Sequence, residues 1–567
     1  MNFKEELIQL LTAETGLAKD EVSILLAVPP DPRLGDYAFP CFKLGENAPQ
    51  EAGKLQEKLK LPPFLRKAEV SGPYLNFFLN QRVLAEETLN AIYKQAKNYG
   101  KGKSTGERVV VEYCGPNTNK PLHLGHVRNM ALGSSMYKIL QFAGNTVSPV
   151  NIINDRGVHI CQSMLAYMKW GAGKEPDKKS DHFVGDFYVL FSKKAAEDES
   201  LNTEVQELLI KWENNDPQTR KIWQKMNEWV LAGHEQTYKR FGAYFEKSYF
   251  ESKYYEQGKE LVFEGLKKGV FTQDAKTGSI SAPLKDFNLP DKILLRGDKT
   301  SIYITQDMHL ATLRYKDFKF DRMLYVVASE QKLHFQQLFK VLELLGKKYA
   351  KDMYHLSYGM VHLPSGRMKS REGTVIDADD IMDEVAVLAE KEIKARHQDI
   401  DGEEVQRRAK IISLAAIKFF MLQTDPVKDI VFNPEESMSF EGETGPYIQY
   451  THARAHSILR KARTEYQLQV APHVNFETFN LAEESAVVKK LYEFPEAIVK
   501  AAETYKPHHL AQYLIGLSQA FNEFYHKCPV LSEEKNITKA RLLLVDSVRQ
   551  VLENGLNLLG IEAPEKM

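Results

Sequence analysis

The sequence predicts an α/β protein joined to an all-α part, and three observations support this class. An apolar run at 107–114, a helical segment from Gly125 to about Phe142 and a second apolar run at 145–154 form a β-α-β unit. The β-α alternation stops near residue 157 and resumes after residue 296. Amphipathic helices follow almost without interruption from about residue 405. We therefore expect a Rossmann-like parallel sheet with a helical insertion, followed by a helical bundle.

The elements before the sheet suggest a small α/β domain at 1–85. A helix opens it, the turn-rich stretch PPDPRLGDYAFP follows, and AEVSGPYLNFFL predicts two short strands. Residues 82–100 are expected to be helical. The segment NYGKGKSTGE, rich in Gly, Lys and Ser, then predicts a linker to the sheet domain.

The sheet domain is expected to span 107–400 and to be interrupted by an insertion at about 157–296. Charged amphipathic stretches such as TEVQELLIKWENN predict that the insertion is mostly helical. After it come the strand RMLYVVAS, the helix QKLHFQQLFKVLELLG and the strand MYHLSYGMVHL. Residues 405–567 are expected to form the helical bundle.

Composition limits the class of protein and its compartment. With 567 residues, 43% of them hydrophobic, the chain is long enough for several domains with sizeable cores. Its net charge of −1 means that any polyanionic partner needs a local basic surface. There is no signal peptide and no apolar run long enough to cross a bilayer, so we expect a cytoplasmic protein without membrane contact. No paired spacing that would indicate a zinc motif or disulfide framework occurs among Cys41, Cys114, Cys161 and Cys528.

The segment NTNKPLHLGHVRNM at 117–130 places two histidines at a strand-to-helix turn. A metal site is disfavoured, because no Asp, Glu or Cys stands nearby at ligand spacing. An isolated His-x-x-His would best be interpreted as a solvated turn. Here, however, a helix N-terminus attracts anions, Gly125 admits a flat base, and Lys120 adds positive charge. The turn therefore predicts a triphosphate site.

A second basic loop, SGRMKSREGTV, occupies 365–375 after the strand SYGMVHL. Charged loops are usually solvated surface, and this one has no Walker-type pattern. Taken together, however, the two segments resemble the signatures of class I aminoacyl-tRNA synthetases. His-Leu-Gly-His at 123–126 resembles His-Ile-Gly-His, and Arg-Met-Lys-Ser-Arg at 367–371 resembles the Lys-Met-Ser-Lys-Ser loop.

Further stretches narrow the resemblance to arginyl-tRNA synthetases, over essentially the whole chain. These are VEYCGPNTNKPLHLGHVRN, SIYITQDMHLATLRY, FEGETGPYIQYTHARAHSILRKA and the N-terminal GDYAFPCFKLGENAPQEAGKLQEKL. Two departures stand out. Ser370 takes the place of a signature lysine, a loss for which Lys120 is expected to compensate. Cys114 and Gly115 replace a frequent Ser-Ser pair.

The resemblance implies a two-step reaction. Arginine attacks ATP to give arginyl-adenylate and pyrophosphate, and the arginyl group then passes to the 2′-hydroxyl of the terminal adenosine of tRNA(Arg). Positioning and charge stabilisation suffice for both steps, so no nucleophilic side chain is required. Mg²⁺ is expected to enter with ATP, without a structural metal in the protein. The family also implies a monomer.

The resemblance further assigns roles to individual residues. Phosphate stabilisation is expected from Lys120, His123, His126, Lys369 and Arg371. ATP binding is expected from Gly125, Gly359, Met360, Val361, Arg367, Met368 and Ser370. Arginine binding is expected from Glu112, Asn117, Tyr303, Asp307 and Gln331. Tyr303 and Asp307 are four residues apart and would share one helix face.

The tRNA surface should be local and basic. Residues 451–464 carry four Arg or Lys residues and no acid, which predicts a phosphate track, although such runs are more often just solvated. In the C-terminal, anticodon-binding domain the expected contacts are Tyr447, Tyr450, Arg454, Arg460 and Lys461. In the N-terminal domain the resemblance implies Asn76 and Phe78.

The sequence is also compatible with functions of other classes. A different class I synthetase, or a small-molecule adenylate-forming ligase, would share both loops, although the latter has no use for the helical C-terminal half. A non-catalytic tRNA-binding paralogue predicts decayed signatures. The intact histidine signature, Lys120 and Asp307 argue against that last function.

Overall fold

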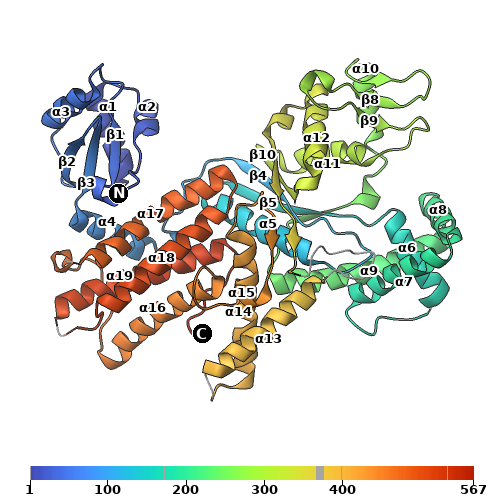
Figure 1. Ribbon diagram of the computed structural model, residues 1–567. Coiled ribbons are helices and arrows are strands. Elements are labelled where there is room, and N and C mark those ends of the chain that lie inside the picture. The colour runs from blue at the N-terminus through green and yellow to red at the C-terminus, as the bar shows by residue number, and fades with distance from the viewer. Residues whose placement is uncertain (1, 172, 365–375, 397–398, 480, 533) are drawn as a thin grey trace.

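The computed structural model describes residues 2–171, 173–364, 376–396, 399–479, 481–532 and 534–567. Figure 1 shows a small N-terminal α/β unit, a central sheet, a helical group projecting from the sheet, and a C-terminal bundle. The predicted class, a parallel-sheet domain with an insertion between a small α/β unit and a helical bundle, is confirmed. Among the described helices, none is both long enough and apolar enough to span a bilayer.

The N-terminal unit packs helices against an antiparallel sheet in the order β1-β3-β2. Its strands are β1 (Tyr37–Pro40), β2 (Leu65–Ser71) and β3 (Tyr74–Leu79), of which β2 and β3 are the two short strands expected from AEVSGPYLNFFL. Its helices are α1 (Phe3–Thr15), α2 (Lys19–Leu25) and α3 (Ala48–Lys58), and α4 (Gln81–Gln95) leads out of it.

The central sheet is parallel throughout, in the order β11-β10-β4-β5-β6. Its strands are β4 (Arg108–Glu112), β5 (Thr146–Ile153), β6 (Lys247–Phe250), β10 (Arg322–Ala328) and β11 (Met353–Tyr358). Along the chain, β4, β5 and β6 follow one another towards one edge of the sheet. The later strands β10 and β11 follow one another towards the other edge. The order therefore reverses between β4 and β10, and ligands bind at the carboxyl ends of strands at such a switch point.

Both faces of the sheet are covered, which explains the continuous apolar run in β4. Val109 and Val111 share a core with α5 (Leu124–Phe142), whereas Val110 lies in a second core with α11 (Tyr303–Phe318) and α12 (Lys332–Leu344). All three valines are almost fully buried. Successive residues of a strand point to opposite faces, so a strand covered on both sides needs apolar residues at every position.

The insertion differs from its expected form after residue 241. Its first part is helical, with α6 (Val158–Ala166), α7 (Ser180–Glu197), α8 (Ser200–Glu213) and α9 (Pro217–Phe241) around a core of their own. The expectation of a mostly helical segment up to 296 is wrong beyond this point. There β6 joins the central sheet, and α10 (Lys259–Lys267) precedes an antiparallel sheet of β7 (Thr272–Gln273), β8 (Ile280–Ala282) and β9 (Lys292–Leu295). Strands of two to four residues are too short to show an alternating pattern in the sequence.

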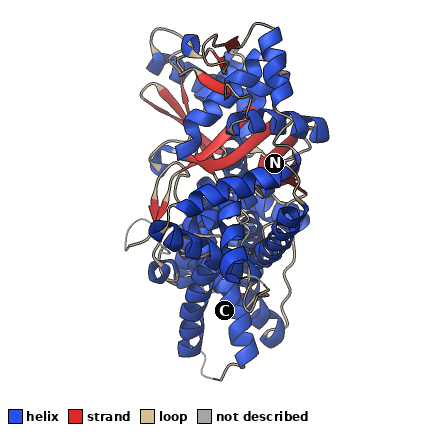
Figure 2. Ribbon diagram, turned by 90° about the vertical axis from the view of Figure 1, so that its right-hand side faces the viewer, coloured by secondary structure: helices blue, strands red, loops and turns tan. Residues whose placement is uncertain are grey.

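The C-terminal part is helical, as expected (Figure 2). It comprises α13 (Ala378–Arg396), α14 (Gly402–Leu422), α15 (Pro434–Ser437), α16 (Gly445–Glu465), α17 (Ala482–Thr504), α18 (His508–Lys527) and α19 (Lys535–Leu558). One parallel pair, β12 (Val361–His362) with β13 (Ile430–Val431), ties the bundle to the end of β11. The same pair thereby positions Gly359 and Met360 at the edge of the site described next.

Candidate active site

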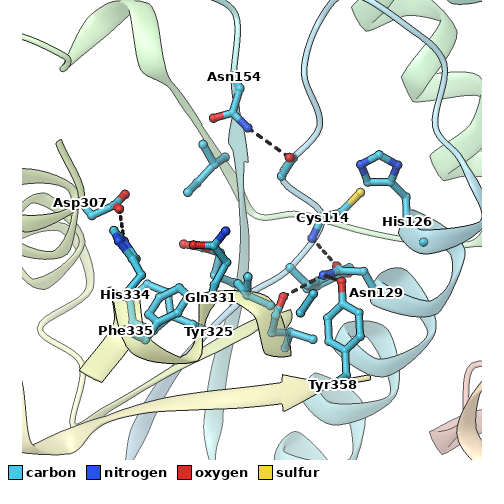
Figure 3. Close-up of a pocket in the computed structure, with 18 of the residues that line it drawn as sticks. Cys114, His126, Asn129, Asn154, Asp307, Tyr325, Gln331, His334, Phe335 and Tyr358 are labelled. Atoms are coloured by element: carbon cyan, nitrogen blue, oxygen red, sulfur yellow. Dashed lines mark hydrogen bonds and ion pairs between the residues drawn. The ribbon is translucent and has the colours of Figure 1, made fainter. Parts of the chain in front are cut away.

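A cavity of about 470 Å³ lies at the carboxyl ends of β4 and β10, where the strand order reverses. This volume suits a small-molecule site. In Figure 3 the side chains of Asp307 and His334 lie on one side of it and that of His126 on the other. The cavity thus has two chemically different ends. Of the residues predicted from the sequence, those that line it are Glu112, Lys120, His123, Gly125, His126, Asp307, Gln331, Gly359, Met360 and Val361.

The two signature histidines are fixed by the backbone at the start of α5. His123 is the N-cap residue, and its Nδ1 accepts a hydrogen bond from the Gly125 amide at 3.1 Å. His126 Nδ1 accepts one from the His123 amide at 3.1 Å, and the two ring centroids lie 4.0 Å apart. This reciprocal arrangement is a capping box that fixes both rings at the helix N-terminus.

Both histidines are neutral at physiological pH. Burial, with a smaller contribution from Lys120, lowers the pKa of His123 to about 4, and burial lowers the pKa of His126 well below its usual range. A neutral imidazole that accepts at Nδ1 carries its proton at Nε2. Each ring therefore presents one N–H donor, so the histidines can bind an anion through hydrogen bonds and not as cations.

Lys120 is the described lysine that lines this end of the cavity. Burial lowers the pKa of its ammonium group, while the carboxylate of Asp377 acts in the opposite direction. Asp377 belongs to the strand-like segment 376–378, which runs antiparallel to the histidine signature. Ala378 donates to the Leu122 carbonyl at 2.8 Å, and Leu124 donates to the Ile376 carbonyl at 3.2 Å.

The second signature loop, 365–375, lies outside the described residues. This applies to the predicted residues Arg367, Met368, Lys369, Ser370 and Arg371. The structure describes the residues up to 364 and from 376, and the segment that follows the loop pairs with the histidine turn.

Arg128 supports the wall of the cavity formed by Gly359 and Met360 and was not predicted from the sequence. It is fully buried, and its guanidinium donates to four backbone carbonyls. Nη1 bonds Gly359 and Met360, and Nη2 bonds Pro426 and Lys428. The arginine thereby fixes the turn from β11 to β12. Arg128 is the one charged residue in the otherwise uncharged sequence VRNMALGSSM. This isolated charge is the signal that could have identified it.

Asn129, the next residue, joins the ends of three strands (Figure 3). Its Oδ1 accepts from the Cys114 amide, and its Nδ2 donates to the Val326 carbonyl at 2.7 Å and to Tyr358 Oη at 3.0 Å. Cys114 has a φ of 61°, in the left-handed region, and its thiol contacts Tyr238 Oη at 3.7 Å. The cysteine that departs from the family pattern is thus buried against α9.

The opposite end of the cavity carries a carboxylate. Asp307 Oδ2 lies 2.7 Å from Nε2 of His334, a second residue that sequence reasoning missed. Gln331 stands at the N-cap of α12, just before His334. Tyr303 does not line the main cavity. It is 78% exposed and lines an adjoining hollow that also contains Asp307, so the two share a helix face as expected.

Glu112 is already paired inside the protein. It forms a buried ion pair with Arg314, whose side chain is 1% exposed. Burial raises the pKa of Glu112, and the charge of Arg314 acts against that shift. Its carboxylate is therefore less free to bind a cation than that of Asp307. Asn117 lies beside the cavity, where its backbone pairs with that of Asn154.

A basic groove of about 880 Å³ lies on the C-terminal bundle. The Arg454 guanidinium stacks over the ring of Tyr450 at 4.7 Å and donates to Asn522. Of the predicted tRNA contacts, Tyr450, Arg454 and Arg460 line this groove, and Tyr447 lines a neighbouring hollow. Lys461 forms a distant ion pair, 3.8 Å long, with Glu465. Three further cations line the groove: Arg396, Arg408 and Lys566.

The two predicted contacts in the N-terminal unit differ in accessibility. Phe78 is partly exposed, and the ammonium group of Lys67 lies 4.2 Å from its ring centroid. Asn76 is only 4% exposed, although it lies on the same face of β3 as Phe78 and opposite the core residues Leu75 and Phe77. This burial counts against a direct contact between the Asn76 side chain and tRNA.

Comparison with known protein families divides the chain into three matched parts. Residues 1–79 match the family described as arginyl tRNA synthetase N terminal domain. Residues 88–434 match tRNA synthetases class I (R), catalytic domain, and residues 448–567 match the DALR anticodon binding domain.

Whole proteins give the same result. The chain is 44% identical to an arginine–tRNA ligase of Treponema pallidum over 562 residues, which cover 96% of this chain and 95% of that protein. It is 43% identical to an arginine–tRNA ligase of Bacteroides fragilis over 558 residues, covering 93% and 92%. The solved arginyl-tRNA synthetase of Thermus thermophilus superposes with a TM-score of 0.86 at 28% identity, over 100% of both chains. The chain therefore belongs to the arginyl-tRNA synthetase family of class I.

Proposed function

We propose that the protein joins L-arginine to tRNA(Arg) for protein synthesis, using ATP and forming an arginyl-adenylate intermediate. Pyrophosphate leaves in the first step and AMP in the second. One observation carries the proposal: a single cavity has a phosphate-binding turn at one end and the carboxylate of Asp307 at the other. An ATP bound at the turn would place its α-phosphate between the two ends, within reach of an arginine carboxylate.

The first step depends on stabilising the charge that develops on the phosphates. The Nε2–H groups of His123 and His126 and the ammonium group of Lys120 supply donors at the N-terminus of α5. Gly125 leaves the turn open, since a Cβ there would lie 3.0 Å from the His123 ring. The backbone of Gly359, Met360 and Val361, held by Arg128, would pack against the adenine and ribose.

Residues of the second signature loop are proposed to act on ATP as well. Lys369 and Arg371 would neutralise the departing pyrophosphate, and Arg367, Met368 and Ser370 would contact ATP. These roles rest on the match between the loop and the family signature.

The arginine end selects the substrate by its guanidinium. Asp307 accepts the guanidinium hydrogen bonds, and His334 holds one of its two oxygens, which sets the direction of the other. Tyr303 covers the outer side, and Glu112 adds a second, partly neutralised carboxylate. Gln331 and Asn117 would bind the amino-acid backbone. Lysine and ornithine leave these hydrogen bonds unmatched, so discrimination requires no editing site.

The tRNA would contact two separate surfaces. Arg454, Arg460 and Lys461 would follow the phosphates, while Tyr450 and Tyr447 would stack against anticodon bases. In the N-terminal unit, Phe78 would contact the tRNA. Because Asn76 is buried, we propose that its side chain supports β3 and does not contact the tRNA.

Mg²⁺ enters with ATP and is held mainly by phosphate oxygens and water. The donor set agrees with this view, because both carboxylates that line the cavity, Glu112 and Asp307, are engaged by protein partners. We further propose that the enzyme works as a monomer in the cytoplasm.

ATP–pyrophosphate exchange with arginine, with and without tRNA(Arg), tests the proposal. We expect exchange with arginine in the presence of tRNA and none with lysine or ornithine. Exchange driven by another amino acid would assign the chain to a different specificity. No exchange under either condition, with tRNA binding intact, would indicate a non-catalytic tRNA-binding protein.

A further inference from the structure

The ammonium group of Lys179 joins three helices behind the active site. Its Nζ donates to Asp181 Oδ2 on α7 at 2.8 Å, to Thr237 Oγ1 on α9 at 2.7 Å and to Asp379 Oδ2 on α13 at 2.8 Å. An ammonium group has three N–H donors, so all of them are satisfied. Two of these helices belong to the insertion, and the third begins the segment that follows the second signature loop.

This junction is packed and buried, unlike a surface ion pair. Asp181 and Thr237 are fully buried. Gly233 on α9 makes the close approach possible, since a Cβ there would lie 2.3 Å from Asp181 Oδ1. Removing one partner from such a cluster leaves a buried charge without compensation, which is far more costly than losing an exposed pair.

The cluster supplies its own cation. Asp181, His182 and Asp379 offer ligand atoms within 4.8 Å of one another, an arrangement that resembles a metal site. However, Lys179 Nζ is hydrogen-bonded to both carboxylates at 2.8 Å. Burial tends to raise the pKa of Asp379, but the hydrogen bonds from His182 and Lys179 outweigh it and hold the carboxyl ionised. The lysine therefore occupies the position between the two carboxylates that a metal ion would need.

Asp379 connects the cluster to the catalytic turn. It is the second residue of α13, and the residue before it, Ala378, donates its backbone N–H to the Leu122 carbonyl at 2.8 Å. His182 adds a second tie, because its ring lies 3.5 Å from Asp377 and 3.4 Å from Asp379. Fixing Asp379 thus fixes the segment that pairs with the histidine signature.

The same insertion helices also contact the turn directly. His234 on α9 donates from Nε2 to the Lys120 carbonyl at 3.0 Å. Gly185 on α7 packs so tightly that a Cβ would lie 2.8 Å from Pro121 Cδ. Both contacts reach the backbone that carries the Lys120 side chain into the cavity.

We infer that Lys179 is a positioning residue for arginine activation. By holding α7, α9 and α13 together, it fixes the backbone around Lys120 and His123 in the geometry that binds the ATP phosphates. Lys179 is not among the described residues that line the cavity, and the helical insertion acquires a role in the first chemical step through it. This inference rests on the proposed function.

The test compares K179M with the wild-type enzyme in pyrophosphate exchange. We expect kcat/KM for ATP to fall by at least about tenfold, because small displacements of positioning groups have large effects on rate. The KM for arginine should change less than about twofold, since Asp307 lies on α11, outside the cluster. K179R keeps the charge and donors and should recover most of the loss.

The matched control is K178M. Lys178 is the adjacent residue and forms an exposed ion pair with Asp186, so its removal should leave all constants unchanged. A double variant, K179M/D379N, removes the charges of Lys179 and Asp379 and leaves only Asp181 of the two carboxylates. It should be less impaired than the two single effects predict together. If K179M does not fold, T237V takes its place in the test. Valine preserves the side-chain volume of threonine and removes only one hydrogen-bonding group. It should show a smaller loss of the same kind.

Direct ATP binding by calorimetry separates this inference from the proposed function. Weaker ATP binding by K179M supports the inference even if the wild type exchanges no pyrophosphate, which would refute the proposed function alone. The inference is overturned if folded K179M binds ATP and turns over like the wild type. It is also overturned if the KM values for arginine and ATP rise equally, or if K178M has the same effect.

Discussion

At the scale of single residues, the cavity works through groups whose charge state is set by their surroundings. The signature histidines are buried and neutral, Lys120 is a partly desolvated cation, and Asp307 is oriented by His334. In each case the surroundings of the side chain set the charge or the orientation with which it can bind a ligand. Single substitutions in the cavity should therefore affect either the use of ATP or the use of arginine, and not both equally.

Lys120→Ala should slow adenylate formation by about a hundredfold, as does the loss of one donor to a developing negative charge. Lys120 is the described lysine that lines the cavity, and it stands at the phosphate end. Pyrophosphate exchange measures the loss, and filter binding should show nearly unchanged tRNA affinity. Near-normal turnover would remove Lys120 from the phosphate site.

His334→Ala should raise the KM for arginine by about tenfold while leaving that for ATP unchanged, because Asp307 loses the donor that orients it. Asp307→Asn should weaken arginine recognition further. The measurement is exchange at varied arginine and at varied ATP. An unchanged or lower KM for arginine in His334→Ala would show that the histidine does not orient Asp307.

The neutral state of His123 predicts a pH-dependent contribution to stability. Its pKa of about 4 in the folded protein lies below the ordinary 6.5, so between these values the unfolded chain binds a proton that the folded protein does not. The free energy of unfolding therefore falls as the pH falls through this window. His123→Asn should show a smaller drop in Tm between pH 6.5 and 4.5 than the wild type. An equal drop in both would contradict the assignment.

At the scale of elements, the start of α5 carries both the residues that face the cavity and the residues that tie the helix to the sheet. Its first turn presents the two histidines, and its second turn carries Arg128 and Asn129 into the sheet. Helices α7, α9 and α13 brace the same turn from behind. The strand-to-helix turn is therefore held both by the sheet and by these three helices.

Arg128→Lys should destabilise the protein by roughly 3 kcal/mol and raise the KM for ATP. A lysine has a single donor nitrogen and cannot reach four carbonyls spread over two segments, so buried acceptors lose their partner. Chemical denaturation and exchange kinetics measure the two effects. A variant with lowered stability but an unchanged KM for ATP would limit Arg128 to a structural role.

At the scale of the whole molecule, the N-terminal unit is anchored on α17 of the C-terminal bundle. Phe3 and Tyr492 pack with ring centroids 5.5 Å apart, Lys4 pairs with Glu496 at 3.0 Å, and Lys489 pairs with Asp36 at 2.8 Å. The first and last parts of the chain are therefore packed against each other, on the same side of the central sheet (Figure 1). The proposed tRNA contacts in these two parts thus belong to one packed unit.

Arg460→Ala should weaken tRNA binding without changing the KM for ATP. Arg460 is exposed, lines the basic groove and belongs to α16, far along the chain from the cavity. Loss of one phosphate contact should lower the slope of log affinity against log salt by about one. Equal salt slopes for wild type and variant would exclude Arg460 from the phosphate track.

The sequence by itself determined the fold class, the two signatures and the family. A β-α-β unit, a capped helix and a signature are encoded within a few tens of neighbouring residues, so their periodicity and spacing are visible locally. Strands as short as β6 and β7 leave no such pattern, which is why the end of the insertion was assigned wrongly. Only the tertiary structure decided that Asp307 meets His334, that Lys179 meets Asp379 and that Arg128 meets Gly359. These partners are 27, 200 and 231 residues apart, and no local spacing specifies which distant groups will satisfy one another once the helices have packed.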